Sequence, residues 1–473
     1  MKDVTKPNII FLLIDSFRSD KFYGKEKTSK TPNLDSLIQN GAYFSQAISS
    51  APVTIPSISS IMTSSYPFKA IMSGGSRFKL NTNVKTFVSH LKETGYFTIA
   101  ITPEILSLSG LTRDFSKVLT FPRHSGLYDG VGQQILNTFE KNISQDPWFL
   151  YIHLLDIHGT ARGFPKNFDD KKFGVNQYEK MISAMDVWIG KIIQKVNLDD
   201  TLIVLTADHG NDAGIYTSEL EKLKVDVNKD DLESFLRIGK NISSKLPKSL
   251  SPLKSKIRKI YLGKKDQIKT KKKSDNIEEI NKKQLTPYKK RILEHAIKME
   301  YDVFDDRFRV PLLFAGYGIK TNTIIQQQIR TMDIFPTILD IINIQKNTPV
   351  DGKSVLPLIN GDHLKELPAY MESTANWTKS KTTDVIGIRY LGYKYFRNRI
   401  NPNEMVGLYD LKIDPLEENN LAEQYPDKVT EMEKLLAKIR LNASKNIEKE
   451  ADSLRNFDEE KRVEEELKKL GYV

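Results

Sequence analysis

The sequence has no cysteine among its 473 residues. Disulfides and thiolate metal sites are therefore excluded, and any metal ion must be bound through oxygen and imidazole ligands. Long apolar runs are missing as well. The apolar stretch near the N-terminus is about seven residues long and enters charged sequence at once, unlike a secretory or membrane-spanning segment. We therefore expect a cytoplasmic globular protein, and its 39% hydrophobic content is enough for a large core.

Positive charge is concentrated in one segment. Residues 245–273 contain twelve lysine and arginine residues and one acidic residue, Asp266, a difference that equals the whole net charge of +11. Such a segment could attract a polyanion or an anionic membrane surface, and it is equally typical of a solvated insert. We predict a peripheral membrane or polyanion contact through residues 244–275. Only Tyr261 interleaves the charges and no nucleic-acid module is recognisable, so no specific nucleic-acid partner is expected.

Continuous apolar segments predict the covered sheet of an α/β protein. The strands are expected at residues 8–15, 148–159 and 201–210. Helical periodicity is present at residues 31–41, with Thr31 as a cap and Gly41 as the closing residue, and at residues 176–196. Sites in such folds lie outside the carboxyl ends of strands. The polar residues at these ends are Asp15, His158, Asp208 and His209.

The α/β pattern divides the chain into three regions. It stops after Asp212, and the Lys-rich residues 213–292 are interpreted as an insertion within a catalytic domain of residues 1–345. The insertion is expected to overhang the site as a lid or docking surface, because it follows the Asp-His pair directly. Turn signals in residues 346–425 predict a small antiparallel sheet with a helix, and residues 426–473 predict a charged helical tail.

Thr54 lies just before a predicted helix. Pro56 suits the first helical position, and apolar residues follow it with helical spacing. Unpaired N–H groups at a helix start attract anions, so a hydroxyl there could attack a bound phosphate or sulfate group. The local sequence by itself favours the simpler interpretation that Thr54 is a helix cap.

Carboxylates and imidazoles at converging strand ends are suitable ligands for Mg²⁺, Mn²⁺, Ca²⁺ or Zn²⁺. One divalent ion touching Asp15, Asp208, His209 and the Thr54 oxygen would lower the hydroxyl pKa and polarise an ester oxygen. Polar residues also end strands in ordinary turns, so the Asp208-His209 pair alone is compatible with a turn.

Eight segments of the chain, in matching order and spacing, resemble the sulfatase family of the alkaline phosphatase superfamily. They are PNIIFLLIDSFRSDKFYG at 7–24, APVTIPSISSIMTSSYP at 51–67, FLYIHLLDIHG at 149–159, TADHG at 206–210, RVPLLF at 309–314, DIFPTILD at 333–340, DGKSVLPLING at 351–361 and LYDLKIDPLEENNLA at 408–422. The resemblance implies an alkaline-phosphatase-like mixed sheet sandwiched by helices, with a small C-terminal antiparallel-sheet subdomain. It also implies that Asp15, Asp208 and His209 are metal ligands, that Thr54 is the nucleophile and that His158 binds the substrate anion.

The resemblance further matches His295, fourteen residues before Arg309, to a family histidine. An imidazole there could protonate the leaving oxygen, although a structural histidine is an equal alternative. Lys298 could supply a lysine that the family carries near this histidine, but it lies two residues away from the usual position. Arg18 could add positive charge near the site. We expect, however, that it forms a salt bridge with a neighbouring residue and does not contact the substrate.

Departures from the family pattern bear on the mechanism. Sulfatases proper carry Cys or Ser in a C/S-x-P-x-R motif that is oxidised to formylglycine, which cannot form from Thr54, and Ile58 replaces the motif arginine. Threonine is the nucleophile of the related phosphoethanolamine and phosphoglycerol transferases, which implies a covalent phosphothreonine. Ser16 replaces the usual second aspartate and favours a one-metal site.

The sequence therefore predicts a metal-dependent hydrolase or transferase with a Thr nucleophile, acting on a phosphate ester in preference to a sulfate ester. The expected substrate is an anionic ester such as a glycan or a lipid head group. The alternatives are a sulfuric ester hydrolase without formylglycine and a non-catalytic anion-binding protein.

Overall fold

The computed structural model describes residues 6–71, 79–141, 143, 147–158, 165–211, 274–298, 303–319, 322–345, 349–373 and 384–444. The chain forms two units, one of residues 1–214 with 301–473 and one of residues 215–300. The basic segment 245–273 lies outside the described residues, so its predicted membrane or polyanion contact and the lid role stay predictions. The same holds for the part of the predicted tail beyond residue 444.

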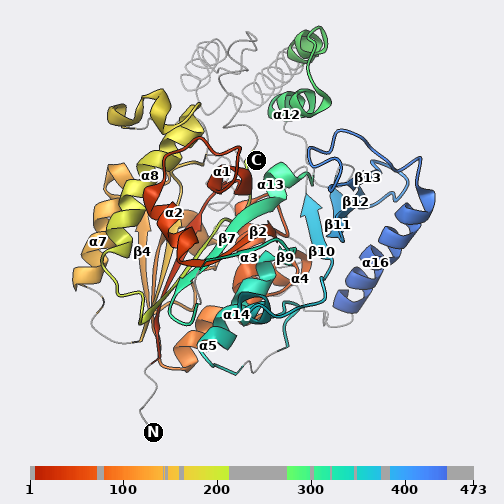
Figure 1. Ribbon diagram of the computed structural model, residues 1–473. Helices are drawn as coiled ribbons and strands as arrows, with labels where there is room; N and C mark the ends of the chain where they lie inside the picture. Colours follow the sequence, from red (N-terminus) through yellow and green to blue (C-terminus); the bar gives the residue numbers. More distant parts are fainter. Residues whose placement is uncertain are drawn as a thin grey trace, which may run out of the picture. The chain divides into compact units, whose positions relative to one another are not determined.

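The first unit is built on a mixed sheet with the strand order β4-β3-β5-β1-β6-β7-β2-β8, in which β9 also pairs with β2 (Figure 1). Strands β4, β3, β5, β1 and β6 are parallel, and β7 runs antiparallel to both β6 and β2. The strands are β1 Asn8–Ile14, β2 Gly41–Ile48, β3 Phe97–Pro103, β4 Lys117–Phe121, β5 Trp148–Leu154, β6 Thr201–Thr206, β7 Arg309–Gly316, β8 Thr323–Ile325 and β9 Ile329–Arg330.

The central strands are continuously apolar because helices cover both faces of the sheet. Residues 9–14 of β1 are buried on both faces, and the Phe11 ring packs against Phe87 and Tyr151 with centroids 5.9 and 5.8 Å apart. The predicted strands in residues 8–15, 148–159 and 201–210 are confirmed, and each ends before the polar residues that follow it.

Helices α2 Pro32–Gln39, α7 Val131–Lys141 and α8 Gln177–Ile193 pack together on one face of the sheet, and α3 Thr54–Thr63, α5 Phe87–Glu93 and α14 Ile334–Ile341 pack on the other (Figure 1). The predicted helix in residues 176–196 is confirmed as α8. Its N-cap is Asn176, whose side chain accepts a hydrogen bond from the Glu179 N–H at 2.9 Å. The shorter helices are α1 Ser19–Phe22, α4 Pro67–Ala70, α6 Glu104–Leu108, α13 Asp305–Phe308, α15 Leu356–Ile359 and the 3-10 turns Leu127–Asp129, Lys166–Phe168, Lys171–Phe173 and Thr331–Asp333.

For α2 the expected N-cap, Thr31, is confirmed, and the expected closing residue, Gly41, is wrong. Gly41 does not close α2, because Asn40 is the C-cap and Gly41 begins β2. A Cβ on Gly41 would lie 2.6 Å from the Phe314 carbonyl oxygen, so glycine allows close strand contact there. Thr31 is the N-cap of α2, but its side chain makes no capping hydrogen bond.

Helix α3 begins earlier than the sequence predicts. Val53 is the N-cap and Thr54 is already helical, so Pro56 occupies the third position. A proline is tolerated there because the first-turn N–H groups have no partner within the helix. All ten residues of α3 are buried, which fixes the helix firmly beneath the candidate site.

The predicted small antiparallel sheet is confirmed and has the order β10-β11-β12-β13. Its strands are β10 Ala369–Ser373, β11 Val385–Tyr390, β12 Tyr393–Asn398 and β13 Gly407–Asp410, and helix α16 Pro426–Ser444 packs beside them (Figure 1). The turn between β11 and β12 needs positive φ at both of its residues, 51° at Leu391 and 84° at Gly392. This two-residue turn fixes the register of the hairpin.

In the second unit the structure places α12 at Pro287–Lys298, with Ile292 and Leu293 buried. In the part of the chain that the structure describes, no helix has both the length and the apolarity to cross a membrane. The division into residues 1–345, 346–425 and 426–473 stays a prediction.

Candidate functional site

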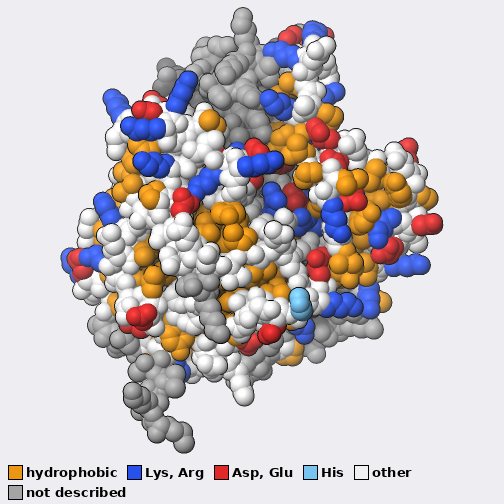
Figure 2. Space-filling model, viewed as in Figure 1, with side chains coloured by type: hydrophobic (Ala, Val, Ile, Leu, Met, Phe, Trp, Pro, Cys, Tyr) orange, Lys and Arg blue, Asp and Glu red, His pale blue; other side chains and the backbone are white. Residues whose placement is uncertain are grey.

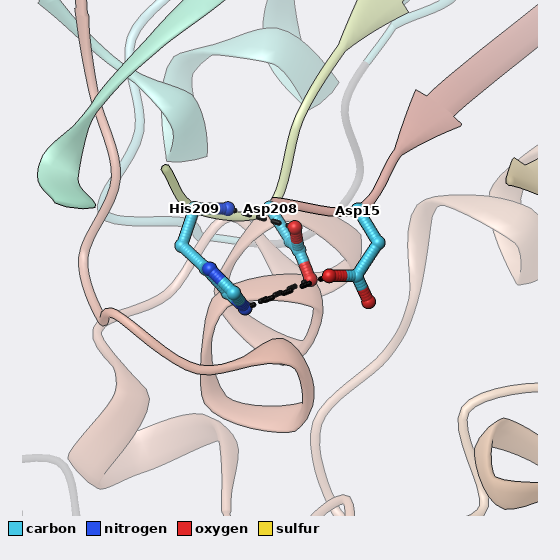
Figure 3. A group of neighbouring side chains, drawn as sticks. All are labelled: Asp15, Asp208 and His209. Carbon is cyan, nitrogen blue, oxygen red and sulfur yellow. Dashed lines mark hydrogen bonds and ion pairs between the residues drawn. The ribbon is translucent and has the colours of Figure 1, made fainter. Parts of the chain in front are cut away.

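Two neighbouring strands of the sheet bring three predicted ligands together. Asp15 follows β1, and Asp208 and His209 follow β6, which pairs in parallel with β1. The three side chains are buried and point toward one another, with one donor atom from each within 4.8 Å of the others (Figure 3). His209 Nε2 lies 3.8 Å from Asp15 Oδ1 and 3.5 Å from Asp208 Oδ2.

Thr54 joins this group from the first residue of α3. Its hydroxyl donates to Asp15 Oδ2 at 3.2 Å and lies 3.5 Å from His209 Nε2. The side chain therefore faces the carboxylates, and Val53 holds the N-cap position that the simpler interpretation gave to Thr54. The structure thus brings all four predicted metal-binding residues into contact.

Serine hydroxyls tie the helix start to the loop after β6. Ser49 and Ser57 both donate to the backbone carbonyl of Asp208, at 2.6 and 2.5 Å, and lie 2.9 Å from each other. Because Ser57 is in the first turn of α3, this contact fixes the separation between Thr54 and Asp208.

Asp208 has one oxygen that is satisfied and one that is not. Its Oδ1 accepts from the backbone N–H groups of Ser16 and His209, at 3.1 and 2.8 Å. Its buried Oδ2 accepts no hydrogen bond. Ser16 adopts a left-handed φ of 64°, a strained conformation for serine that costs about 1 kcal/mol or more. This backbone conformation points the Ser16 N–H toward the Asp208 carboxylate.

The His209 ring is oriented by its neighbour. Its Nδ1 lies 2.8 Å from the carbonyl oxygen of Gly210 and donates its proton to it, and this contact turns Nε2 toward the two carboxylates. Gly210 in turn donates its N–H to the Arg307 carbonyl at 2.8 Å. A Cβ on Gly210 would lie 2.0 Å from the Asp306 carbonyl oxygen, so only glycine fits here.

A family model described as Sulfatase matches residues 7–344, and one described as N-sulphoglucosamine sulphohydrolase, C-terminal, matches residues 294–445. The chain belongs to the sulfatase family.

Individual relatives are distant. Arylsulfatase K of Danio rerio is 28% identical over 150 residues, which are 31% of this chain and 28% of that protein. Choline-sulfatase of Rhizobium meliloti (strain 1021) is 21% identical over 511 residues and aligns with 88% of this chain and 83% of its own length. The chain thus spans little more than a quarter of arylsulfatase K in that match.

Among solved structures, the phosphonate monoester hydrolase of Agrobacterium radiobacter is similar with a TM-score of 0.65 and 15% identity, covering 93% of this chain and 96% of that one. At this identity the likeness concerns the fold, and it agrees with the alkaline-phosphatase-like mixed sheet that the sequence predicts.

Two histidines of this sulfatase-family site flank Asp15. His158, the predicted anion-binding residue, follows β5 and is 15% exposed, with Nε2 3.9 Å from Asp15 Oδ1. His153, which the sequence reasoning missed, is fully buried on β5 with Nε2 3.4 Å from Asp15 Oδ2. Tyr151 Oη lies 3.2 Å from its Nδ1. The sequence feature that could have identified His153 is the presence of a histidine within an otherwise apolar strand.

The electrostatics of the site fit a bound cation. Burial opposes ionisation of Asp15, but His158, His153 and His209 outweigh it and hold its pKa well below the usual range. Burial and the neighbouring Asp15 charge raise the pKa of Asp208 to about 8. A divalent ion would remove the repulsion between the carboxylates and engage the unsatisfied Asp208 Oδ2. The oxygen and imidazole donors suit such an ion.

For two predicted residues the structure describes no side-chain position. His295 and Lys298 lie on α12 in the second unit, and their side chains fall outside the described residues. Their predicted roles stay predictions. Arg18 forms the expected salt bridges, with Asp20 at 2.8 Å and Asp306 at 2.7 Å.

Proposed function

We propose that this sulfatase-family chain cleaves a phosphate ester, by hydrolysis or by transfer, with Thr54 as the nucleophile. The observation that supports it is the contact of the Thr54 hydroxyl with Asp15 and His209, at 3.2 and 3.5 Å, at the start of a buried helix. The substrate is an anionic ester, such as a phosphorylated glycan or a lipid head group.

Asp15, Asp208, His209 and the Thr54 oxygen would hold one divalent ion, and Mn²⁺, Zn²⁺, Mg²⁺ and Ca²⁺ all accept such donors. When bound, the ion would favour ionisation of the hydroxyl and polarise the ester. The unsatisfied, buried Oδ2 of Asp208 is the observation that supports a cation here.

The residue types favour phosphate over sulfate. Thr54 cannot become formylglycine, so the aldehyde-hydrate route of sulfatases is closed to this chain. Ile58, at the position of the family's motif arginine, is fully buried and apolar. A hydroxyl nucleophile that forms a phosphothreonine agrees with the resemblance to the threonine-dependent phosphotransferases.

In the first step the Thr54 Oγ–phosphorus bond forms and the bond from phosphorus to the leaving oxygen breaks. The hydroxyl proton passes to a neighbouring base, and the leaving alcohol takes up a proton. His158 and the N–H groups at the start of α3 would stabilise the non-bridging oxygens. In the second step the oxygen of water or of an acceptor alcohol attacks phosphorus and regenerates Thr54.

The test compares wild type with Thr54→Ala and Thr54→Ser on an aryl phosphodiester, an aryl phosphomonoester and an aryl sulfate, each with the four metals. Thr54→Ala should lose at least about 1,000-fold in kcat, and Thr54→Ser should retain part of it. Wild type quenched during turnover of a phosphate ester should carry phosphate on the Thr54 peptide. Unchanged turnover by Thr54→Ala would refute the nucleophile. An adduct formed only from the aryl sulfate would assign the chain to sulfate esters.

A further inference from the structure

Ser16 contacts both carboxylates of the candidate metal site. Its backbone N–H donates to Asp208 Oδ1 at 3.1 Å, and its hydroxyl donates to Asp15 Oδ1 at 2.7 Å. The residue is buried and has a φ of 64°, a conformation that a serine keeps only where its surroundings hold it. One serine therefore links two predicted ligands that follow different strands.

The hydroxyl of Tyr178, in the first turn of α8, holds the loop that contains Ser16. It donates to the Ser16 carbonyl at 2.7 Å and accepts the N–H of Arg18 at 3.1 Å. These two backbone groups lie on either side of Phe17, so a single hydroxyl fixes the loop across three residues. Burial raises the pKa of Tyr178 well above its usual range, so the phenol keeps the proton that it donates.

The topology explains why a residue of α8 reaches this loop. Helix α8 lies between β5 and β6 in the chain, and both strands are parallel to β1. The helix therefore begins at the edge where these strands end, which is also where Asp15 follows β1. Figure 2 shows charged side chains on the surface where Figure 1 labels α8. Tyr178 belongs to the inner face of the helix, since Ile182 and Met185 follow it at helical spacing and all three are buried.

We propose that Tyr178 is a positioning residue of the metal site, which acts through Ser16 to hold the Asp15 and Asp208 carboxylates where one divalent ion can bind both. The role rests on the proposed function, because it concerns the same metal site. Without the hydroxyl, the Ser16 carbonyl loses this donor and the loop relaxes. The N–H and the hydroxyl of Ser16 then no longer fix the two carboxylates, and the ion binds more weakly.

Tyr96 offers a matched control at the other end of β1. Its hydroxyl donates to the Pro7 carbonyl at 2.8 Å, and the side chain is buried as deeply as that of Tyr178. Pro7 precedes β1, whereas Ser16 follows it. The variants Tyr96→Phe and Tyr178→Phe each remove one buried hydrogen bond from a hydroxyl to a carbonyl beside the same strand, but only the second bond lies next to the ligands.

The experiment is a calorimetric titration of the full-length chain with Mn²⁺, Zn²⁺, Mg²⁺ and Ca²⁺. The ion that wild type binds most tightly is then used for the variants. Tyr178→Phe should weaken its binding about 10-fold, and Tyr96→Phe should match wild type within about twofold. Both variants should lower the thermal midpoint of the metal-free chain by a similar amount, because each loses one such bond. In the Ser16→Ala background, which lacks the hydroxyl that binds Asp15, Tyr178→Phe should weaken binding by a smaller factor than it does in wild type.

Equal affinities of Tyr178→Phe and Tyr96→Phe for the ion would overturn the role. The same factor of loss with and without Ser16→Ala would also overturn it, because Tyr178 would then not act through Ser16. A wild type that binds none of the four ions would remove the metal site and this role together. A failure of the Thr54 nucleophile is recognised separately, by unchanged turnover of Thr54→Ala, and leaves the titration intact.

Discussion

Lys394 and Lys85 form ion pairs of similar length in opposite surroundings. Lys394 Nζ, fully buried on β12, lies 2.5 Å from Asp305 and 2.7 Å from Glu417. Lys85 Nζ lies 2.9 Å from Glu93, and both side chains are about half exposed, at 49% and 50%. The buried pair joins the C-terminal sheet to α13 and therefore supports the candidate site.

We predict that Lys394→Met lowers the free energy of unfolding by about 3–5 kcal/mol. In this variant the buried Asp305 and Glu417 carboxylates lose the positive charge of the lysine, while Met fills about the same volume as the lysine side chain. Lys85→Met should cost about 0.2–1 kcal/mol at most, because water screens the exposed pair. Because the two ion pairs have similar lengths, the difference in unfolding free energy between the two variants measures the effect of burial.

The pH dependence follows from Asp305. Burial opposes its ionisation, but the charges of Arg389, Lys394 and Arg309 outweigh it and hold its pKa well below the usual range. A carboxyl with a depressed folded pKa contributes stability above its unfolded pKa of about 3.9, and this is lost as pH falls through the folded pKa. The gap between wild type and Lys394→Met should therefore be full at pH 7 and shrink below about pH 4.

Urea unfolding followed by tryptophan fluorescence checks this prediction, since Trp148 and Trp188 lie in the first unit. Adding Glu417→Gln to Lys394→Met should recover at least about 1 kcal/mol. The amide still accepts the Asp305 N–H, which Glu417 now accepts at 2.8 Å. A loss in Lys394→Met no larger than in Lys85→Met, or no recovery in the double variant, would refute the reasoning.

Two further predictions concern the metal ligands. Asp208→Asn keeps the acceptor for the two backbone N–H groups but removes the charge, so Mn²⁺ affinity should fall about 100-fold or more in a calorimetric titration, with the fold retained by circular dichroism. A fall of less than threefold would remove Asp208 from the ligand set. Gly210→Ala places a methyl 2.0 Å from the Asp306 carbonyl, so the loop must move. Turnover and Mn²⁺ affinity should then drop together, and wild-type values for both would contradict the close approach.

Local patterns in the sequence determined the elements and most of the site residues. Residues 8–15 and 201–210 were predicted to be buried strands, because a continuous apolar strand is stable only when both of its faces are covered. The polar residues that end these runs, Asp15, Asp208 and His209, follow from the rule that sites lie at the carboxyl ends of strands. The helix boundaries at Gly41 and Thr54 were mispredicted, because Gly41 allows close strand contact instead of ending the helix and Pro56 occupies the third helical position instead of the first.

The converging strand ends and the family resemblance predicted that Asp15, Thr54, Asp208 and His209 meet, and the tertiary structure decided through which strand pairing and which further contacts they do so. Apolar periodicity gives the burial of a strand but not its neighbours, so the pairing of β1 with β6, far apart in the sequence, could not be read from the chain. The same holds for His153 and Tyr178, whose contacts with Asp15 and with the loop that follows it depend on strand register and on α8. Side-chain type determined what chemistry these residues can perform, and long-range packing determined where they can perform it together.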